Sequence, residues 1–229
     1  LKNKFSFIFK NSVQVFAGSK YLMDSALHFG AKSVVEIPTG VNCFKYDQLS
    51  LKKKNNLFSI IWIGSPSTTK CIVDILPALK KVCLDKKTLI RLVGAKEIQT
   101  DFLPLESFQW SELDEVPLIS ECHLGIMPLT ENPWEKGKCG FKIIQYFACG
   151  LPVIASPIGA NNHIVDHGVN GFLANNIDEW VKYINYFKNN PEKLKSFGIE
   201  AKKKANKLYS TNILQDYFFK NILKNMKKN

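Results

Sequence analysis

The sequence contains no run of about eighteen apolar residues, which is the length that a membrane-spanning helix needs. Its opening, LKNKFSFIFK, also lacks the long apolar segment and the small-residue cleavage site of a secretory signal peptide. These absences argue against an integral membrane protein and against an exported one. We therefore expect a soluble protein that works in the cytoplasm.

Paired cysteines are also missing, because none of the six cysteines forms a CxxC motif and most of them lie in apolar runs. Such cysteines are typical of small core residues in a reduced protein. No HExxH zinc motif occurs either. His163 and His167 lie four residues apart beside Asp166, but no third ligand is evident, so we expect a capped surface helix there. We expect no metal and no cofactor.

Acidic residues are scarce near the C-terminus. The formal net charge is +11, and residues 181–229 contain twelve lysines against three acidic residues. A solvated helix face is the simplest interpretation, and contact with anionic lipid at the inner face of the membrane is an alternative. Aromatic residues do not interleave with these lysines, so we do not expect nucleic acid as a partner.

The residues that are present indicate an α/β protein. Of the 229 residues, 45% are hydrophobic, which is ordinary globular composition. Strands that are apolar throughout alternate with amphipathic helices, a pattern typical of a doubly wound, Rossmann-like parallel sheet. The expected strands are 12–18, 33–38, 58–64, 88–94, 107–110, 123–129 and 152–156, and the expected helices include 20–29, 68–84, 112–120, 177–187, 191–208 and 213–226.

Three parts follow from this order. Residues 1–40 have the pattern of the end of a larger domain, residues 41–208 contain the doubly wound domain, and residues 209–229 form a C-terminal helix expected to pack back on the first part. The lysine-rich stretch 46–56 has the composition of a linker. We expect the chain to be a fragment of a longer protein or a truncated gene product.

Two strand ends carry residues that suit a phosphate ligand. The first is the loop after strand 58–64, where Gly64, Ser67, Thr68 and Lys70 offer a close backbone, hydroxyls and an ammonium group. It is not a Walker A loop, and no GxGxxG motif occurs in the chain. Ligands of open α/β sheets bind outside the carboxyl ends of the strands, so this loop is a candidate site.

The second strand end is WEKGKCGFKIIQYFACGLPVIASPIG, at 134–159. Gly137 and Gly140 allow backbone N–H groups to approach a ligand, and Phe141 begins a helix whose dipole favours an anion. Lys138 and Lys142, together with Lys136 nearby, add positive charge. The combination suits a diphosphate. The alternative is that the glycines form a turn and the lysines are solvated.

The segment at 128–174, from PL through ENPWEKGKCGFKIIQYFACGLPVIASPIGANNHIVDHG to GFLA, closely resembles the donor-binding region of the group 1 retaining glycosyltransferases. Further matches follow in the order of that family: VFAGSKYL, EIPTGVN, IIWIGSPSTTK, RLVGA, the segment around Trp110, and the DEW helix. The resemblance covers nearly the whole chain. It implies the GT-B architecture of two Rossmann-like domains, of which this chain contains mainly the C-terminal one.

The resemblance also implies a function. Relatives transfer a sugar from a nucleotide-diphosphate donor with retention of configuration, and the acceptor here would be a glycan or a lipid-linked glycan. The diphosphate would lie against Gly140, Phe141, Lys138 and Lys142, helped by the first loop, and Gln145 would bind the ribose. The base would lie near Val93 and Gly94 and near Gln109 and Trp110. We expect Glu135, Lys138 and Lys142 to act on the reacting groups.

The chain departs from the family pattern at two positions. Relatives usually have two glutamates eight residues apart, where this chain has Gly137 and Gln145. Gln145 retains hydrogen-bonding groups for ribose, whereas Gly137 removes a carboxylate and leaves Glu135 as the nearest substitute. A non-catalytic module that binds a nucleotide sugar or a protein partner is therefore the alternative to an enzyme.

Overall fold

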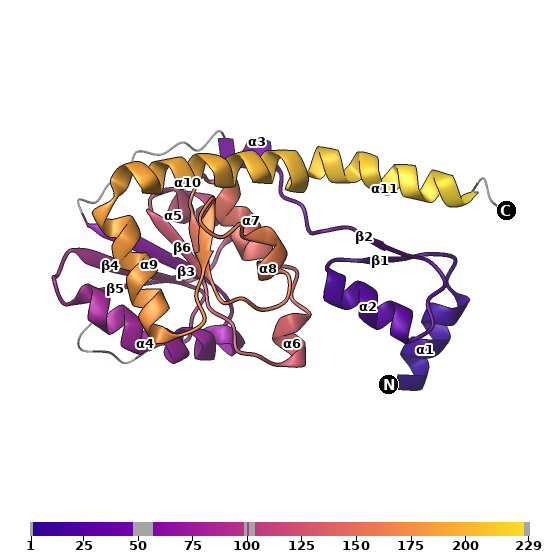
Figure 1. Cartoon of the computed structure of the whole chain (residues 1–229), viewed down its shortest axis with the longest axis horizontal. Coiled ribbons are helices and arrows are strands. Elements are labelled where there is room, and N and C mark those ends of the chain that lie inside the picture. The colour runs from indigo at the N-terminus through magenta and orange to yellow at the C-terminus, as the bar shows by residue number, and fades with distance from the viewer. Residues whose placement is uncertain (1, 48–56, 99, 101–103, 227–229) are drawn as a thin grey trace.

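The computed structural model describes residues 2–47, 57–98, 100 and 104–226. Its main feature is a parallel sheet of six strands in the order β5-β4-β3-β6-β7-β8 (Figure 1). The strands are β3 (Phe58–Ile63), β4 (Thr88–Val93), β5 (Leu105–Phe108), β6 (Leu124–Met127), β7 (Val153–Ala155) and β8 (Gly171–Leu173). The chain leaves β3 in both directions across the sheet, which confirms the expected doubly wound fold.

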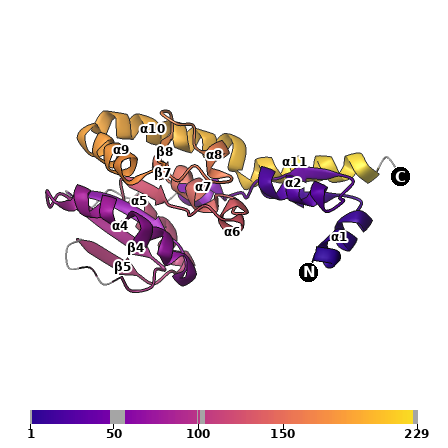
Figure 2. The ribbon, with the colours of Figure 1, turned by 60° about the horizontal axis from the view of Figure 1, so that its bottom comes forward.

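The alternation of side chains along β3 explains why helices cover both faces of the sheet. Ile60 and Trp62 point into the core beneath α4 (Thr69–Cys83) and α9 (Ile177–Asn189). Ile61 and Ile63 belong to the opposite core, beneath α5 (Glu112–Ser120) and α7 (Phe141–Ala148). Helices cover both faces of the sheet (Figure 2). Because β3, β4, β6 and β7 are therefore buried on both faces, their residues are mainly apolar rather than alternating.

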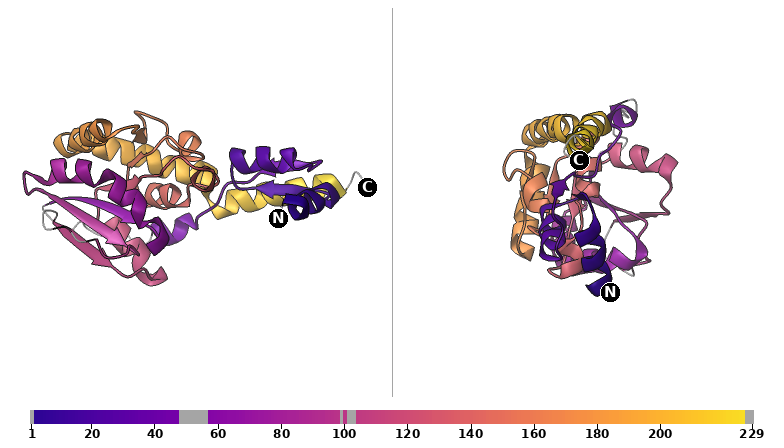
Figure 3. Two further views of the ribbon diagram at one scale, coloured as in Figure 1. Left: turned by 90° about the horizontal axis from the view of Figure 1, so that it is seen from below. Right: turned by 90° about the vertical axis from the view of Figure 1, so that its right-hand side faces the viewer.

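Residues 2–36 form a small unit that stands apart from the large sheet (Figures 1 and 3). It contains α1 (Lys2–Asn11), β1 (Val15–Ala17), α2 (Lys20–His28) and β2 (Val34–Glu36), and β1 pairs with β2 in parallel. The C-terminal helix α11 (Thr211–Met226) runs alongside this unit, where the rings of Phe16 and Phe218 lie 4.7 Å apart. None of the described helices is both long and apolar enough to cross a membrane.

Two connections join this unit to the large sheet, and they are hydrogen-bonded to each other. The Val41 backbone N–H donates to the Tyr209 carbonyl at 2.9 Å, and the Thr211 N–H donates to the Val41 carbonyl at 3.0 Å. Tyr209, which the sequence grouped with the C-terminal helix, is buried in the core that α7 covers. The division of the chain at residues 40 and 208 stays a prediction.

Several elements differ from the sequence prediction. The expected strand 107–110 lies two residues earlier, and the expected helix 191–208 is divided into α10 (Pro191–Lys204) and a π-helical turn (Ala205–Tyr209). The helices α1, α3 (Cys43–Asp47) and α6 (Pro133–Lys136) were not predicted, the last two because four or five residues are too few to show a helical period. Most of the expected linker at 46–56 lies outside the described residues.

The buried thiols give a prediction about alkaline stability. Burial raises the pKa of both Cys83 and Cys122 to about 11, from an ordinary value of 9.0. An unfolded chain therefore loses these protons near pH 9, whereas the folded chain keeps them. We expect the free energy of unfolding to fall as the pH rises from 9 towards 11, measured by urea titration at several pH values. The Cys83→Ala/Cys122→Ala variant should show a shallower fall, and an equal fall would refute this assignment.

Candidate functional site

A cavity of about 660 Å³ lies where the strand order reverses, at the carboxyl ends of β3, β4, β5 and β6 and at the start of α7. Ligands of open α/β sheets bind at this position. Of the candidate residues, the cavity is lined by Gly64, Thr68, Gly94, Trp110, Lys138, Gly140, Phe141 and Lys142. The fold thus brings four separate segments of the sequence to one place.

At the start of α7, four consecutive backbone N–H groups have no acceptor in the part of the protein that the structure describes. Among the hydrogen bonds of the described residues, none is donated by the backbone of Cys139, Gly140, Phe141 or Lys142, and all four residues line the cavity. Gly140 is the N-cap, in a left-handed conformation with a φ of 67°, and because glycine has no side chain, no side chain caps the helix. Unpaired amides at a helix start attract an anion.

The two lysines of the cavity are each paired with a carboxylate, which the sequence did not predict. Lys138 Nζ lies 2.5 Å from Glu135 Oε2, and Lys142 Nζ lies 3.2 Å from Glu115 Oε2. Glu135 is only 1% exposed and does not line the cavity. The reason is that Asn132 caps α6, which turns Glu135 inward towards Lys138. In this structure Glu135 is therefore a buried counter-ion and not a group at the cavity surface.

Glu115 is the functional residue that sequence reasoning missed. Its Oε2 accepts hydrogen bonds from Trp110 Nε1 at 2.6 Å and from Lys142 Nζ at 3.2 Å. Its Oε1 accepts one from Gln145 Nε2. Glu115 is only 7% exposed and lies on the buried face of α5. An acidic residue on the apolar face of the expected helix is the sequence feature that could have identified it. One carboxylate thus positions two residues of the cavity wall.

Gln145, the expected ribose ligand, does not reach the cavity. It is 1% exposed, and besides its bond to Glu115 its amide donates to the hydroxyl of Tyr46 at 3.0 Å. Burial raises the pKa of Tyr46, so this phenol stays protonated. Gln145 Oε1 is buried without a hydrogen-bond partner among the described residues. Gln145 therefore contacts the cavity only through Glu115.

Two glycines allow the loops after β3 and β4 to meet. Gly94 has a φ of 74°, and a Cβ added there would lie 2.5 Å from the Gly64 carbonyl oxygen. A Cβ at Gly64 would lie 2.2 Å from the ring of Trp62. Trp110 covers this junction with 50% of its surface exposed. Neither glycine position therefore leaves room for a larger residue, and the rings of Trp62 and Trp110 both belong to the cavity lining.

Three other candidate residues lie outside the cavity. Ser67 and Lys70 line a separate depression of about 530 Å³ with Lys96 and Glu97, because α4 begins at Thr69 and turns them away. The side chain of Val93 is fully buried, and its carbonyl accepts a hydrogen bond from the Gly64 N–H at 3.0 Å. Among the hydroxyl residues of the first loop, Ser65 and Thr68 line the cavity, and the Ser65 N–H donates to Thr68 Oγ1 at 2.9 Å.

The histidine cluster differs from its predicted form. The helix α8 comprises only Asn161–Ile164, so His163 is helical whereas Asp166 and His167 follow the helix. His167 Nδ1 instead accepts a hydrogen bond from the Leu173 N–H at 3.1 Å. Among the described residues, no group of three or more His, Cys, Asp or Glu side chains is placed to hold a metal ion.

Comparisons with known proteins agree with the fold. Comparison with curated proteins finds no match. Among solved structures, Anabaena HepE in complex with UDP and glucose is similar over 96% of this chain and 67% of its own, with a TM-score of 0.77 at 17% identity. A glycosyltransferase from Rickettsia africae matches over 99% of this chain and 68% of its own, with a TM-score of 0.80 at 18% identity. These likenesses establish a shared fold.

A third similar structure is sucrose-phosphate synthase from Thermosynechococcus elongatus. It matches over 100% of this chain and 62% of its own, with a TM-score of 0.78 at 17% identity. A sequence model of the family described as "Glycosyl transferases group 1" matches residues 58–190, which contain every residue of the cavity. This match spans more than half of the sequence, and the chain therefore belongs to the group 1 glycosyl transferase family.

Proposed function

We propose that this chain binds the diphosphate of a nucleotide sugar at the start of α7 and supplies the donor-binding half of a retaining glycosyltransferase. The observation that carries the proposal is the run of four unpaired amides from Cys139 to Lys142. The first N–H groups of a helix have no acceptor within the helix, so a ligand with several anionic oxygens suits them. The cavity of about 660 Å³ is within the range of small-molecule sites.

The parts of the donor have distinct places in this proposal. The base lies against Trp110 beside Gly94, where a half-exposed ring offers a stacking surface. The diphosphate lies on the amides of α7. Gln145 acts on the nucleotide indirectly, because it holds Glu115, which in turn holds Trp110 and Lys142. This replaces the direct ribose contact that the resemblance implies.

The ion pairs of the lysines are compatible with phosphate binding. An ammonium group has three N–H donors, so Lys138 keeps Glu135 and still has donors for a phosphate oxygen. Breaking that pair would leave a buried carboxylate without its partner, which is strongly unfavourable. The carboxylates thus orient the ammonium groups, and the protein needs no metal to stabilise the charge of the departing diphosphate.

The reaction proposed is transfer of the sugar to a glycan or a lipid-linked glycan with retention of configuration. The departing phosphate accepts the proton of the attacking hydroxyl, so no protein base is required. The lysines of α10 and α11 would hold the protein at an anionic membrane surface if the acceptor is lipid-linked. UDP-sugars are the first donors to test, because UDP is the nucleotide in the HepE complexes.

One observation supports a second candidate function. No acidic side chain lines the cavity among the described residues, since Glu135 and Glu115 lie behind its wall. A domain that binds a nucleotide sugar without transferring the sugar would have this arrangement. Measurement of sugar transfer from UDP-glucose separates the two functions: turnover by the chain supports the enzyme, and binding without turnover supports the module.

The experiment that tests donor binding is calorimetric titration of the chain with UDP-glucose and with GDP-, ADP- and dTDP-sugars. Lys142→Ala should weaken binding about 10- to 100-fold, because a hydrogen bond to a charged group contributes about 1.5–3 kcal/mol. Glu115 keeps Trp110 and Gln145 as donors, so this variant should still fold.

The matched control is Lys70→Ala, which removes an ammonium group from the neighbouring depression and should leave affinity unchanged. Equal losses in the two variants would mean that charge in general, and not the α7 site, attracts the nucleotide. The absence of binding by any nucleotide sugar would refute the proposal.

A further inference from the structure

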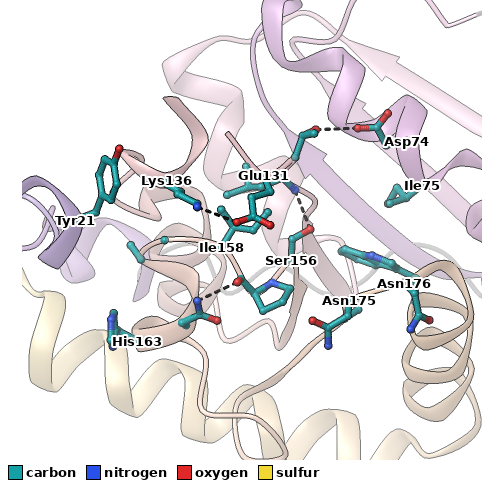
Figure 4. A pocket seen from close by; sticks show the side chains of 18 of the residues that line it. Tyr21, Asp74, Ile75, Glu131, Lys136, Ser156, Ile158, His163, Asn175 and Asn176 are labelled. Carbon is teal, nitrogen blue, oxygen red and sulfur yellow. Dashed lines mark hydrogen bonds and ion pairs between the residues drawn. The ribbon is translucent and has the colours of Figure 1, made fainter. Parts of the chain in front are cut away.

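A second and larger cavity, of about 820 Å³, lies at the carboxyl ends of β6, β7 and β8 (Figure 4). One wall comes from α2 of the N-terminal unit, including Tyr21, and the others come from α4, α6, α8 and α9 and from the loops that follow the three strands. Only Leu129 lines both this cavity and the first one. The segment between Lys136 and Lys138 separates them, because Lys136 lines the second cavity and Lys138 the first.

The charged side chains of this second cavity are paired with one another. Lys136 Nζ lies 2.8 Å from Glu131 Oε1, and Lys20 Nζ lies 2.5 Å from Asp24 Oδ1. The remaining carboxylate, Asp74, accepts a hydrogen bond from the Thr130 hydroxyl at 2.9 Å. The backbone N–H groups of Asn176 and Ile177, at the start of α9, have no acceptor among the described residues, but both lysines of this cavity are already paired with carboxylates. The cavity therefore suits a neutral ligand better than a phosphate.

The amide side chains at the rim keep half of their hydrogen-bonding capacity. Asn162 donates to the Pro157 carbonyl at 3.0 Å and Asn175 donates to Glu179 at 3.1 Å, and neither side-chain carbonyl oxygen has a partner within the described residues. Asn176 accepts from the Glu179 N–H at 2.9 Å, which leaves its NH₂ group. The phenol of Tyr21 has no hydrogen-bond partner among the described residues.

This mixture of donor and acceptor groups matches the hydroxyl groups of a sugar. A sugar hydroxyl both donates and accepts, so a ring with several hydroxyls satisfies acceptor and donor groups that lie side by side. The floor supplies the apolar contact that the C–H groups of a sugar need, through Ile75, Ile158 and the buried Trp180. A volume of about 820 Å³ is also larger than the first cavity, which suits more than one sugar ring.

We infer that this second cavity binds a neutral oligosaccharide, and that the saccharide is the acceptor of the reaction. The assignment as acceptor rests on the proposed function, whereas the binding of the saccharide does not. Its place beside the wall at Lys136–Lys138 puts it next to the proposed donor site. The acceptor class is thereby narrowed to a glycan without charged groups at the bound residues.

The test is saturation-transfer NMR and calorimetry of the chain with maltotriose, cellotriose and chitotriose. Asn162→Trp fills the rim from an exposed position of α8 and should weaken trisaccharide binding at least tenfold. Asn189→Trp makes the same change at an exposed position of α9 away from both cavities and should leave it unchanged. Lys142→Ala should also leave it unchanged.

Three results would overturn the inference: no binding of any neutral trisaccharide, binding that Asn162→Trp leaves intact, or displacement of the trisaccharide by UDP alone. Titration with UDP-glucose in the same samples separates the two proposals. A trisaccharide that binds where no nucleotide sugar does would refute the proposed donor function and leave the saccharide site standing.

Discussion

Gly140→Ala is expected to weaken nucleotide-sugar binding at least about 100-fold, since the loss of two charge-assisted hydrogen bonds removes about 3 kcal/mol. The change adds one methyl group and removes no charge. Its effect comes from the backbone, because Gly140 has a φ of 67° and holds the four unpaired amides in one concave turn. A residue with a Cβ disfavours this left-handed conformation by about 1–2 kcal/mol.

The added Cβ also meets the core. It would lie 2.2 Å from Cδ1 of Ile164, which is 4% exposed. Overpacking of this kind typically costs about 1–3 kcal/mol, so the turn and the α8 side chain must move apart. We therefore expect a lower melting temperature together with the loss of binding, measured by differential scanning calorimetry and nucleotide titration.

A matched control separates the effect of backbone strain in general from the effect of changing the turn before α7. Gly168 has a φ of 82°, and nothing lies within 4 Å of a Cβ added there. Gly168→Ala should therefore show the backbone strain without the clash, and it should bind the nucleotide sugar normally. The assignment of the anion site to α7 would be wrong if Gly140→Ala, while still folded, bound the donor as tightly as Gly168→Ala does.

Arg91→Met is expected to lower the melting temperature by about 6–12 °C, from the loss of about 3 kcal/mol and the usual slope for a chain of this size. Arg91 is 5% exposed and donates to two carboxylates, Glu106 at 2.9 Å and Glu121 at 3.1 Å. It also donates to the Leu118 carbonyl at 3.1 Å. Methionine fills the space but leaves these acceptors without their donor. We use about 3 kcal/mol, the lower end of the range for breaking a buried ion pair, because the Glu106 side chain is 37% exposed.

Arg91→Lys should recover little of the stability, because one ammonium group cannot copy the planar fork that reaches the edge strand β5 and the end of α5 at once. The control is Lys81→Met, which removes an ion pair with Asp178 at the surface. The Lys81 side chain is 54% exposed and that of Asp178 is 89% exposed. That change should cost less than about 1 kcal/mol. Equal melting temperatures for Arg91→Met and Lys81→Met would show that the arginine network contributes no more than a surface pair.

The fold could be predicted from the sequence because its signals are local. Strands such as β3 are mainly apolar, and most of them are followed by a helix, so the pattern indicates a parallel sheet without any knowledge of contacts. The helix start at Phe141 was likewise predicted from the sequence.

The counter-ions could not be foreseen in this way. Glu115 and Lys142 are 27 residues apart, and Gln145 and Tyr46 are 99 apart. Only packing of α5 and α3 beneath α7 brings them together. The orientation of Glu135 depended on a helix of four residues, which is too short to leave a periodic signal. Features that depend on neighbouring residues in the sequence could therefore be predicted. Side-chain contacts between residues distant in the sequence could not.

The pair of connections at Val41 and Tyr209 determines how the molecule responds to a cut backbone. A protease that cleaves between residues 37 and 40 severs one connection only. The released fragment stays folded through its internal β1–β2 pairing, and it remains bound to the rest of the chain through the ring of Phe16 against Phe218 on α11. Both pieces should then elute together in gel filtration and separate only in denaturant, so a nicked preparation would pass as an intact one in any native assay.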